Sequence, residues 1–389
     1  MMSPAPRRIV HAAENIKGGV GTYLRDLLVA QRASFGDGVV IAVVPETQAG
    51  ILDSPAGVEI VTFDNRGPRW LSTLRLALRM REVMERAGAS VVHLHSTFAG
   101  LALRPLLRWM GSDEGDRPVV VYCAHGWSFD RETSAISKRV AIWLERALAP
   151  LCDAIVCISW HDTWLARKVG VAPDKLVHIS NGVPREAPQA LPGTPGPQWP
   201  EGRRRVLFVG RFDRQKGVDL FVEAMAELGD SVFAYLAGDS VLGDGNELRL
   251  PENARRTGWL NAAQLTAYYE TAEVLVAPSR WEGFGLIAAE AMRAGLPVIA
   301  SRVGGLAEIV EHGVTGLLIE PDNRQALVSA MRALELRSPK AMGEAGRQRF
   351  LRHYTLDRAH AQLSALYQNL LAQVSSAQVA DAGAAAPEG

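Results

Sequence analysis

A chain of 389 residues is too long for one ordinary hydrophobic core, so we expect two domains of about 150–200 residues each. With 42 basic and 42 acidic residues the formal net charge is zero, which argues against a nucleic-acid partner but allows local basic patches. The three cysteines form no CxxC pair, and the N-terminus lacks the apolar core of a signal peptide. No apolar run reaches the roughly 18 residues that span a bilayer. We therefore expect a cytoplasmic protein with reduced thiols.

In chain order, the N-terminal half alternates apolar runs with helical patterns. A first buried strand is predicted at 8–13, followed by Gly18-Gly19-Val20-Gly21 and a helical pattern. Glycines at such a turn let a ligand approach the backbone, or simply let the helix pack on the sheet, and both interpretations stay open. Further strands are predicted at 38–44, 58–63, 89–94, 118–122 and 153–158, and helices at 70–87, 98–110 and 135–149. This alternation indicates a parallel, doubly wound α/β sheet.

A proline-rich linker is predicted at 185–202, because the stretch from Pro184 onward carries six prolines and no periodicity. Beyond it, strands are predicted at 205–210, 231–237, 273–277 and 297–300, and helices at 217–228, 262–271, 284–294 and 323–335. We expect two Rossmann-like domains, 1–184 and 203–355, that present their strand ends to a common cleft. The alanine-rich tail 375–389 is predicted to be disordered.

The stretch SRWEGFGLIAAE, residues 279–290, is the strongest candidate site. It follows a predicted strand and contains Gly283-Phe284-Gly285, which opens a predicted helix. The first N–H groups of a helix are unpaired and partly positive, so they suit a phosphate. Glu282 lies just before the helix and Glu290 about two turns into it. Two carboxylates around a phosphate site suit a ligand with hydroxyls at both ends and phosphates between them, such as a sugar nucleotide.

Two cations are predicted at another strand end of the same domain. The segment VLFVGRFDRQKGVD, residues 206–219, places Arg211 and Lys216 in the loop between a strand and a helix. Arginine can bind a phosphate through two hydrogen bonds and lysine as a point charge. Together with the amides near Phe284 to Leu286, they would neutralise a diphosphate without a metal ion. Each cation alone would be an ordinary surface charge.

Histidines mark the N-terminal domain. His125 directly follows a predicted strand, next to Gly126 and Trp127, which fits a pocket that stacks on a sugar ring. The alternative is a histidine bonded within its own loop. His93 and His95 share one face of a predicted strand, but the sequence shows no third metal ligand near them. No DxD-type acidic pair follows a strand, so we expect no metal site.

A cluster of arginines lies between residues 66 and 108, where the only acids are Glu82 and Glu85. Apolar residues such as Trp70, Leu74 and Leu78 lie beside them. A basic amphipathic helix of this kind could lie on an anionic membrane surface. The alternative is a solvated helix face whose apolar stripe is in the core.

Over nearly its whole length the chain resembles the retaining glycosyltransferases of family 4, which have the GT-B fold. The most specific match is the family's EX7E motif, here EGFGLIAAE from Glu282 to Glu290. Weaker matches, in the expected order, are GGVGTYL, AHGW, ISNGV, VGRFDRQKGVDLFVEA and GLPVIASRVGGLAEIV.

The resemblance implies roles for individual residues. Arg211 and Lys216 would hold the nucleotide diphosphate, and the amides of Phe284, Gly285 and Leu286 would bind phosphate and sugar. Glu282 would contact the hydroxyls of the donor sugar and Glu290 those of the ribose. Gly19 would close over the diphosphate, and His125 would contact the donor sugar near the reacting carbon. A last helix, about 356–373, would pack back on the N-terminal domain.

The expected function is transfer of a hexose from a nucleotide sugar to a sugar acceptor, for example a lipid-linked intermediate of a bacterial cell-surface polysaccharide. No cofactor or metal is expected. Location at the inner face of the membrane would follow if the basic region 66–108 contacts lipid. Two alternatives remain open: a nucleotide-sugar 2-epimerase of the same fold, and a non-catalytic nucleotide-sugar-binding partner of another transferase.

Overall fold

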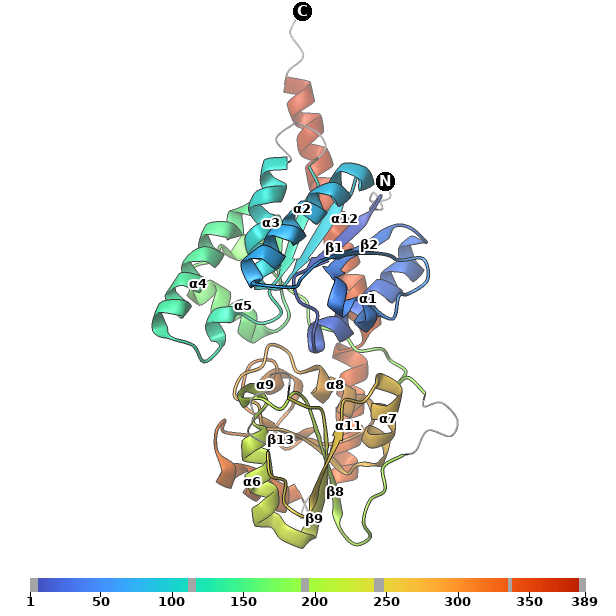
Figure 1. Ribbon diagram of the computed structural model, residues 1–389, viewed down its shortest axis with the longest axis vertical. Helices are drawn as coiled ribbons and strands as arrows, with labels where there is room; N and C mark the ends of the chain where they lie inside the picture. The colour runs from blue at the N-terminus through green and yellow to red at the C-terminus, as the bar shows by residue number, and fades with distance from the viewer. Residues whose placement is uncertain (1–5, 111–116, 190–195, 241–247, 335–337, 385–389) are drawn as a thin grey trace, which may run out of the picture. The chain divides into compact units, whose positions relative to one another are not determined.

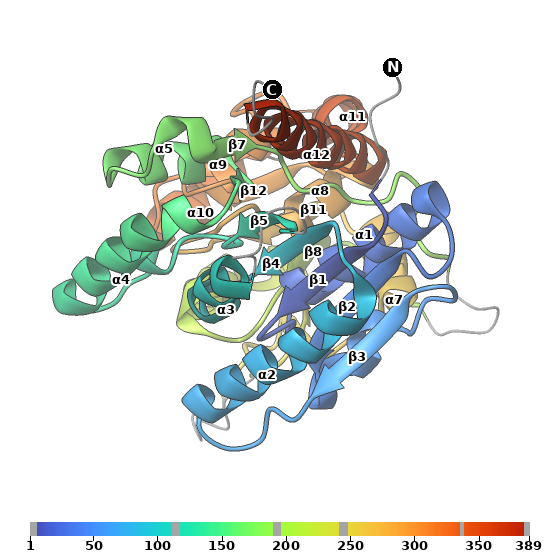
Figure 2. The same cartoon turned by 90° about the horizontal axis from the view of Figure 1, so that it is seen from above.

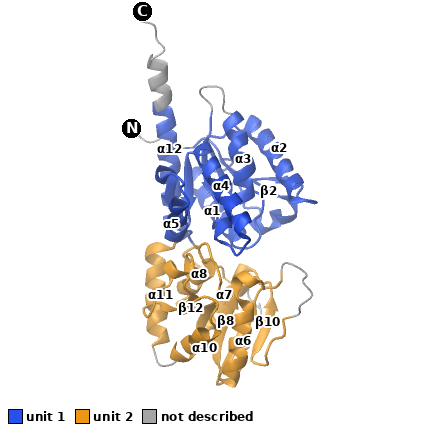
Figure 3. Ribbon diagram, turned by 90° about the vertical axis from the view of Figure 1, so that its left-hand side faces the viewer, with its two compact units in different colours: residues 1–182, 356–389 blue, residues 183–355 orange. Residues whose placement is uncertain are grey.

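The computed structural model describes residues 6–110, 117–189, 196–240, 248–334 and 338–384. The chain divides into two compact units (Figure 3). Unit 1 holds residues 1–182 and 356–389, and unit 2 holds 183–355. The division at residue 182 lies close to the predicted end of the N-terminal domain at 184, and the predicted linker is counted with unit 2.

Unit 1 is built on a parallel seven-stranded sheet in the order β3-β2-β1-β4-β5-β6-β7. The strands are β1 (Ile9–Ala13), β2 (Val40–Pro45), β3 (Glu59–Phe63), β4 (Val91–His95), β5 (Val119–Cys123), β6 (Ala154–Cys157) and β7 (Leu176–His178). The strand order reverses beside β1, which pairs with β2 on one side and β4 on the other. In open parallel sheets, ligands bind beyond the carboxyl ends of the strands at such a reversal.

Helices cover both faces of this sheet (Figures 1 and 2). They are α1 (Gly19–Phe35), α2 (Arg69–Ala87), α3 (Thr97–Met110), α4 (Ala135–Leu148), α5 (Trp160–Lys168) and α12 (Leu356–Ala384). On one face Leu24 and Leu28 of α1 pack with Ala42 and Val44. On the other face a larger cluster joins α2 and α3 to the strands. The central strands are buried on both faces, which is why they read as continuous apolar runs.

Unit 2 repeats this architecture with six parallel strands in the order β10-β9-β8-β11-β12-β13. The strands are β8 (Arg204–Val209), β9 (Val232–Ala237), β10 (Ala254–Gly258), β11 (Val274–Ala277), β12 (Val298–Ser301) and β13 (Gly316–Ile319). The helices are α6 (Val218–Leu228), α7 (Ala262–Thr271), α8 (Leu286–Arg293), α9 (Leu306–Ile309), α10 (Arg324–Ala333) and α11 (Pro339–His353). Here the order reverses between β8 and β11, the two strands that the candidate loops follow.

The C-terminal helix differs from its prediction. Helix α12 begins at Leu356, packs against α1 and β5 of unit 1, and runs to Ala384. The segment from Ser375 onward, which we expected to be disordered, begins within this helix, and 385–389 lie outside the described residues. Alanine has the highest helix propensity, so an alanine-rich segment that continues a packed helix remains helical. No helix among the described residues is both long and apolar enough to cross a bilayer.

Candidate functional site

The candidate site in unit 2 is formed by two loops that follow neighbouring strands. One loop connects β8 to α6 and carries Arg211 and Lys216, and the other connects β11 to α8 and carries Glu282. The Lys216 ammonium is paired with the Glu282 carboxylate, and these side chains are only 16% and 12% exposed. The fold thus places in direct contact two charged residues that are 66 positions apart in sequence.

Backbone contacts hold the two loops against each other. Gly217 ends the short η5 helix (Arg214–Lys216) with a φ of 65°, and a Cβ there would lie 2.1 Å from the Pro278 carbonyl oxygen. Only glycine fits this close approach. The Arg280 amide donates to the Gln215 carbonyl at 2.8 Å, and the Gln215 side chain donates to the Trp281 carbonyl at 3.1 Å. These contacts therefore hold the loop of Lys216 against the loop of Glu282.

Arg211 is more exposed than Lys216. Its guanidinium donates to Gln215 Oε1 at 2.7 Å and lies 3.1 Å from Asp213. The Asp213 side chain also caps η5 by accepting from the Lys216 amide. Arg211 and Asp213 are each 35% exposed, so the guanidinium is oriented by the loop while part of it stays accessible.

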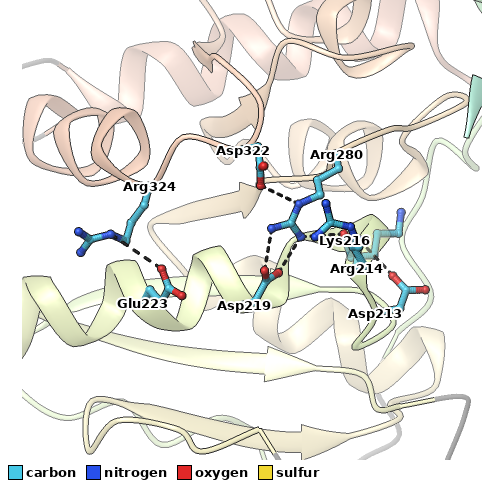
Figure 4. Close-up of polar contacts among 8 residues, drawn as sticks. All are labelled: Asp213, Arg214, Lys216, Asp219, Glu223, Arg280, Asp322 and Arg324. Carbon is cyan, nitrogen blue, oxygen red and sulfur yellow. Dashed lines mark hydrogen bonds and ion pairs between the residues drawn. The ribbon is translucent and has the colours of Figure 1, made fainter. Parts of the chain in front are cut away.

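A second charge network supports the same loops (Figure 4). Arg280 lies between Asp219 and Asp322, donating to Asp219 at 2.7 and 2.8 Å and to Asp322 at 2.8 Å. Partial burial works to raise the pKa of Asp219, but the hydrogen bonds and charge of Arg280 outweigh it and hold that pKa below its usual value. Arg280 itself is 5% exposed, so it braces the start of the Glu282 loop and is little available to a ligand.

The start of α8 is shaped by glycines. Gly285 has a φ of 98° and precedes Leu286, the first residue of the helix. A Cβ at Gly304 would lie 1.7 Å from the Glu282 carbonyl oxygen, which shows how closely the next loop packs here. Phe284 is buried against Tyr354. A helix leaves its first amides without intrahelical acceptors, so the Leu286 end of α8 is suited to an anion.

Glu290 ends the EX7E motif that Glu282 begins, and it has its own hydrogen-bond partner. Its carboxylate accepts a hydrogen bond from the Tyr269 hydroxyl of α7 at 2.8 Å. Burial, followed by the nearby carboxylate, raises the pKa of Tyr269, so this hydroxyl remains a donor. Sequence reasoning missed Tyr269 because its partner is 21 positions away and it is part of an ordinary helical pattern.

In unit 1, Gly19 and His125 follow two strands of the other sheet. Gly19 is the exposed first residue of α1. Tyr23 of the same helix lies edge-on to the His125 ring, with the two ring centroids 5.3 Å apart. His125 has a φ of 55° and its Nε2 lies 2.9 Å from His95 Nδ1. Burial lowers the pKa of His125 to about 4, so the ring is neutral at physiological pH.

One prediction about the histidines is wrong. His93 and His95 do have a third histidine beside them, because His11 on β1 is the register partner of His93 on β4. The only signal in the sequence was a polar residue inside the apolar run of β1. Pairing between strands about 80 residues apart cannot be read from that run alone.

Two family models match the chain. The model described as Glycosyltransferase Family 4 matches residues 17–187, and the model described as Glycosyl transferases group 1 matches residues 195–349. Together they cover the candidate residues of both units.

Relatives agree with these models. A Klebsiella pneumoniae protein, named an uncharacterized 41.2 kDa protein in the cps region, is 32% identical over 327 residues, 83% of this chain and 88% of that protein. The UDP-Gal:alpha-D-GlcNAc-diphosphoundecaprenol alpha-1,3-galactosyltransferase of Escherichia coli is 27% identical over 279 residues, 67% of this chain and 70% of that enzyme.

Solved structures show the same fold. Sucrose-phosphate synthase from Thermosynechococcus elongatus has a TM-score of 0.79 at 22% identity, covering 94% of this chain and 100% of that one. HepE from Anabaena, in complex with UDP and glucose, has a TM-score of 0.76 at 18% identity, covering 93% and 100%. The sheets of units 1 and 2 are the two Rossmann-like domains of the GT-B fold. The chain belongs to the glycosyltransferases of family 4.

Proposed function

We propose that this glycosyltransferase moves a hexose, with retention of configuration, from a nucleotide-diphosphate sugar to a lipid-linked saccharide of cell-surface polysaccharide synthesis. The observation that carries the proposal is the contact of Lys216 with Glu282 beside Arg211 and the start of α8. Cations beside a helix N-terminus suit a diphosphate, and a carboxylate beside them suits sugar hydroxyls.

Negative charge grows on the diphosphate as it leaves the sugar. Lys216, Arg211 and the first amides of α8 would stabilise this charge where it develops, which is electrostatic catalysis by preorganised groups. Until the donor binds, the Glu282 carboxylate neutralises Lys216 and holds it in place. We propose that these groups suffice without a metal ion.

Retention requires that the acceptor attack the face that the nucleotide leaves. A covalent intermediate would need a carboxylate nucleophile beneath the ring. We propose same-face attack instead, in which the departing phosphate takes the acceptor proton, and we assign no nucleophile. Glu282 is assigned to the donor sugar, Glu290 to the ribose, and His125 and Gly19 to the donor sugar and the diphosphate.

The nature of the substrates is proposed by analogy with relatives. The name of the E. coli relative gives a UDP-galactose donor and a diphosphoundecaprenol-linked acceptor, and the Klebsiella relative comes from a cps region. HepE was solved with UDP-glucose. For this chain we therefore propose a UDP-hexose donor and a polyprenol-linked saccharide acceptor.

A polyprenol-linked acceptor lies in a membrane, and unit 1 exposes apolar side chains that suit contact with one. Helix α2 buries Leu76, Met80 and Val83, yet Trp70, Leu74 and Leu78 are at least 50% exposed. Helix α4 exposes a second apolar stripe, formed by Ile136, Val140 and Trp143. Exposed apolar groups of this kind are typical of a membrane-facing surface.

The arginines of the region 66–108 contribute less charge than their number suggests. Arg75 pairs with Asp64, Arg86 with Glu59, and Arg69 with Glu14, acids that lie outside the counted region. Arg104 is buried against Glu145 of α4 at 2.8 Å. We therefore propose that membrane contact depends on the apolar side chains more than on net charge.

The transfer reaction is tested with labelled UDP-hexoses and a polyprenol-linked acceptor extract. Label that moves to lipid supports the proposal. Isomerised free donor would instead indicate a 2-epimerase, and binding without turnover a non-catalytic partner. A thermal-shift screen against UDP, GDP and ADP sugars identifies the donor first, because a ligand that binds the folded state raises its Tm.

Membrane contact is tested by co-sedimentation with phosphatidylglycerol vesicles. Combined Trp70→Ala, Leu74→Ala and Leu78→Ala substitutions should lower the bound fraction several-fold. Trp259→Ala in unit 2 is the matched control, because Trp259 is also exposed, at 58%, but lies in the other unit. Equal binding of both variants would contradict the proposed surface.

A further inference from the structure

A continuous chain of hydrogen bonds leads from His125 into the core of unit 1. His125 Nε2 lies 2.9 Å from His95 Nδ1, His95 Nε2 lies 2.9 Å from His11 Nδ1, and His11 Nε2 lies 2.7 Å from Gln31 Oε1. The residues come from the loop after β5, from β4, from β1 and from α1. His11, His95 and Gln31 are at most 1% exposed, whereas His125 is partly exposed.

Burial keeps every ring in this chain neutral. It lowers the pKa of His11 and of His125 to about 4, and that of His95 well below its usual value, with the neighbouring histidines adding to the effect at His95. A neutral imidazole carries a hydrogen on one nitrogen only. Each ring must therefore donate at one end and accept at the other.

The amide oxygen of Gln31 sets the direction of the chain, because an oxygen without a hydrogen can only accept. His11 must then donate from Nε2, which leaves its Nδ1 to accept from His95 Nε2. In the same way His95 Nδ1 accepts from His125 Nε2. The Nδ1 of His125 is left without a hydrogen.

The three histidines His11, His93 and His95 are poorly arranged to bind a metal ion. Nitrogens of His11, His93 and His95 lie within 4.8 Å of one another. However, the His93 and His95 rings are stacked, with centroids 4.2 Å apart and planes 28° apart. Ligand nitrogens of stacked rings point side by side and do not converge on the centre of a tetrahedral site. The contact between His11 and His95 is better explained as a hydrogen bond.

The ionisable groups that surround these hydrogen-bonded histidines are uncharged as well. Tyr23 of α1, Tyr367 of α12 and Cys123 of β5 all have pKa values raised by burial, and His93 has a pKa lowered by burial. Tyr367 hydrogen bonds to His93 at 2.7 Å. No charged side chain therefore competes with Gln31 for the direction of the chain among the groups described here.

We propose that Gln31, acting through His11 and His95, fixes His125 as its Nε2–H tautomer, so that Nδ1 is the unprotonated nitrogen. The three buried residues are positioning residues, because they act on a ligand only through His125. If the protein is the proposed transferase, on which this part of the inference rests, the unprotonated Nδ1 would accept a hydrogen bond from a hydroxyl of the transferred sugar. A ring fixed in this way needs no reorganisation when the donor binds.

The tautomer is measured directly by 15N NMR of the full-length, ligand-free protein with labelled histidine, at neutral pH. The expected spectrum shows a single neutral form of His125 with a proton on Nε2 and a Nδ1 shift typical of a bare nitrogen. A proton on Nδ1 would mean that the chain runs in the opposite direction, and it would overturn the proposal. Because no donor is present, this result does not depend on the transferase assignment.

A pair of variants tests the role of Gln31. Gln31→Leu removes the terminal acceptor, so the His125 signals should shift toward a mixture of tautomers and kcat should fall about tenfold with little change in donor KM. Gln31→Met keeps the length of the side chain without the acceptor oxygen, so it should give the same shift and exclude lost packing as its cause. Leu28→Ala removes packing from α1 but none of the hydrogen bonds between His125 and Gln31. It should therefore lower Tm and leave the His125 tautomer unchanged.

The outcomes separate the two ideas. An unchanged His125 tautomer in Gln31→Leu would overturn the positioning role even if activity fell, since lost packing alone would explain the fall. A shifted tautomer with no transfer in any variant or in the wild type would leave the positioning role standing and overturn the proposed function. If Gln31→Leu does not fold, as judged by circular dichroism, the wild-type spectrum remains the deciding measurement.

Discussion

The two units share a parallel sheet with helices on both faces, yet they build their candidate sites from opposite kinds of groups. In unit 2 the strand ends carry charges that neutralise one another, such as Lys216 with Glu282 and Arg280 with Asp219. In unit 1, strands β1 and β4 and the loop after β5 carry neutral histidines joined by hydrogen bonds. The same fold thus offers one site suited to an anionic group and another suited to an uncharged one.

The largest effect is expected from Glu282→Ala, which removes half of the central ion pair of unit 2. It should lower kcat by about 100-fold or more, because it removes the proposed sugar contact and leaves Lys216 without its partner. Steady-state transfer assays and circular dichroism measure activity and folding together. Near-normal activity would remove Glu282 from its assigned role. Glu223→Ala, at an exposed ion pair elsewhere in unit 2, should leave activity unchanged.

A double-mutant cycle sharpens the claim that the charges of unit 2 act as a pair. Lys216→Met alone should lower kcat/KM by about 100-fold, because the proposed diphosphate site loses one of its two cations. Combined with Glu282→Gln, it should cost much less than the product of the two single effects, since residues in contact are coupled. Strictly multiplicative losses would show that the two side chains act independently.

Acid titration should distinguish the units by their pH windows. His11 has a pKa of about 4 when folded against 6.5 for an unperturbed histidine, so between these values the unfolded chain binds more protons. The contribution of His11 to the free energy of unfolding should therefore fall by about 3 kcal/mol as the pH drops from 6.5 to 4. His93, His95 and His125, whose pKa values are also lowered by burial, add to this loss in unit 1.

Unit 2 should respond at lower pH. Asp219 has a lowered pKa, so its stabilising effect is present above the unfolded value near 4 and is lost as the pH falls through the folded pKa. Its side chain is 48% exposed, so solvent screening limits the effect to under about 1 kcal/mol. Hydrogen exchange measured by mass spectrometry reports the two units separately. If unit 2 lost protection from exchange at a higher pH than unit 1, the expected order of acid sensitivity would be wrong.

The smallest effect is expected from chelation. If the charges of unit 2 stabilise the leaving group by themselves, excess EDTA should leave the transfer rate unchanged. The control is a metal-dependent transferase assayed in the same buffer. A strict requirement for added Mg²⁺ or Mn²⁺ would show that the protein cations are insufficient.

Most of both folds, and the site of unit 2, could be predicted from the sequence because they depend on local patterns. Glycines beside Glu282 and cations after an apolar run are neighbours in the chain, and the alternation of strands and helices predicted both sheets. Strands β7, β10 and β13 were missed. Strand β10 reads ARRTG and lacks an apolar pattern, because it lies at the edge of its sheet.

Contacts between distant segments could not be predicted. The chain from His125 to Gln31 depends on strand register, since His11 pairs with His93 and Ala13 with His95. Similarly, Arg104 finds Glu145 across 41 positions, and both lie on helices that read as ordinary amphipathic patterns. A one-residue change in the register of β1 against β4 would turn His11 to the other face of the sheet.

Helix α12 has a consequence for the order in which the protein can be made. Residues 183–355 are contiguous, so unit 2 can fold as soon as it leaves the ribosome, whereas unit 1 lacks one of its helices until residues 356–384 have been synthesised. Tyr367 on that helix is fully buried and bonds to His93. The histidine chain is therefore left uncovered on that side during translation, although all of its own residues are among the first to be made. Domains usually mature from the N-terminus onward, and here we expect the first domain begun to be the last completed.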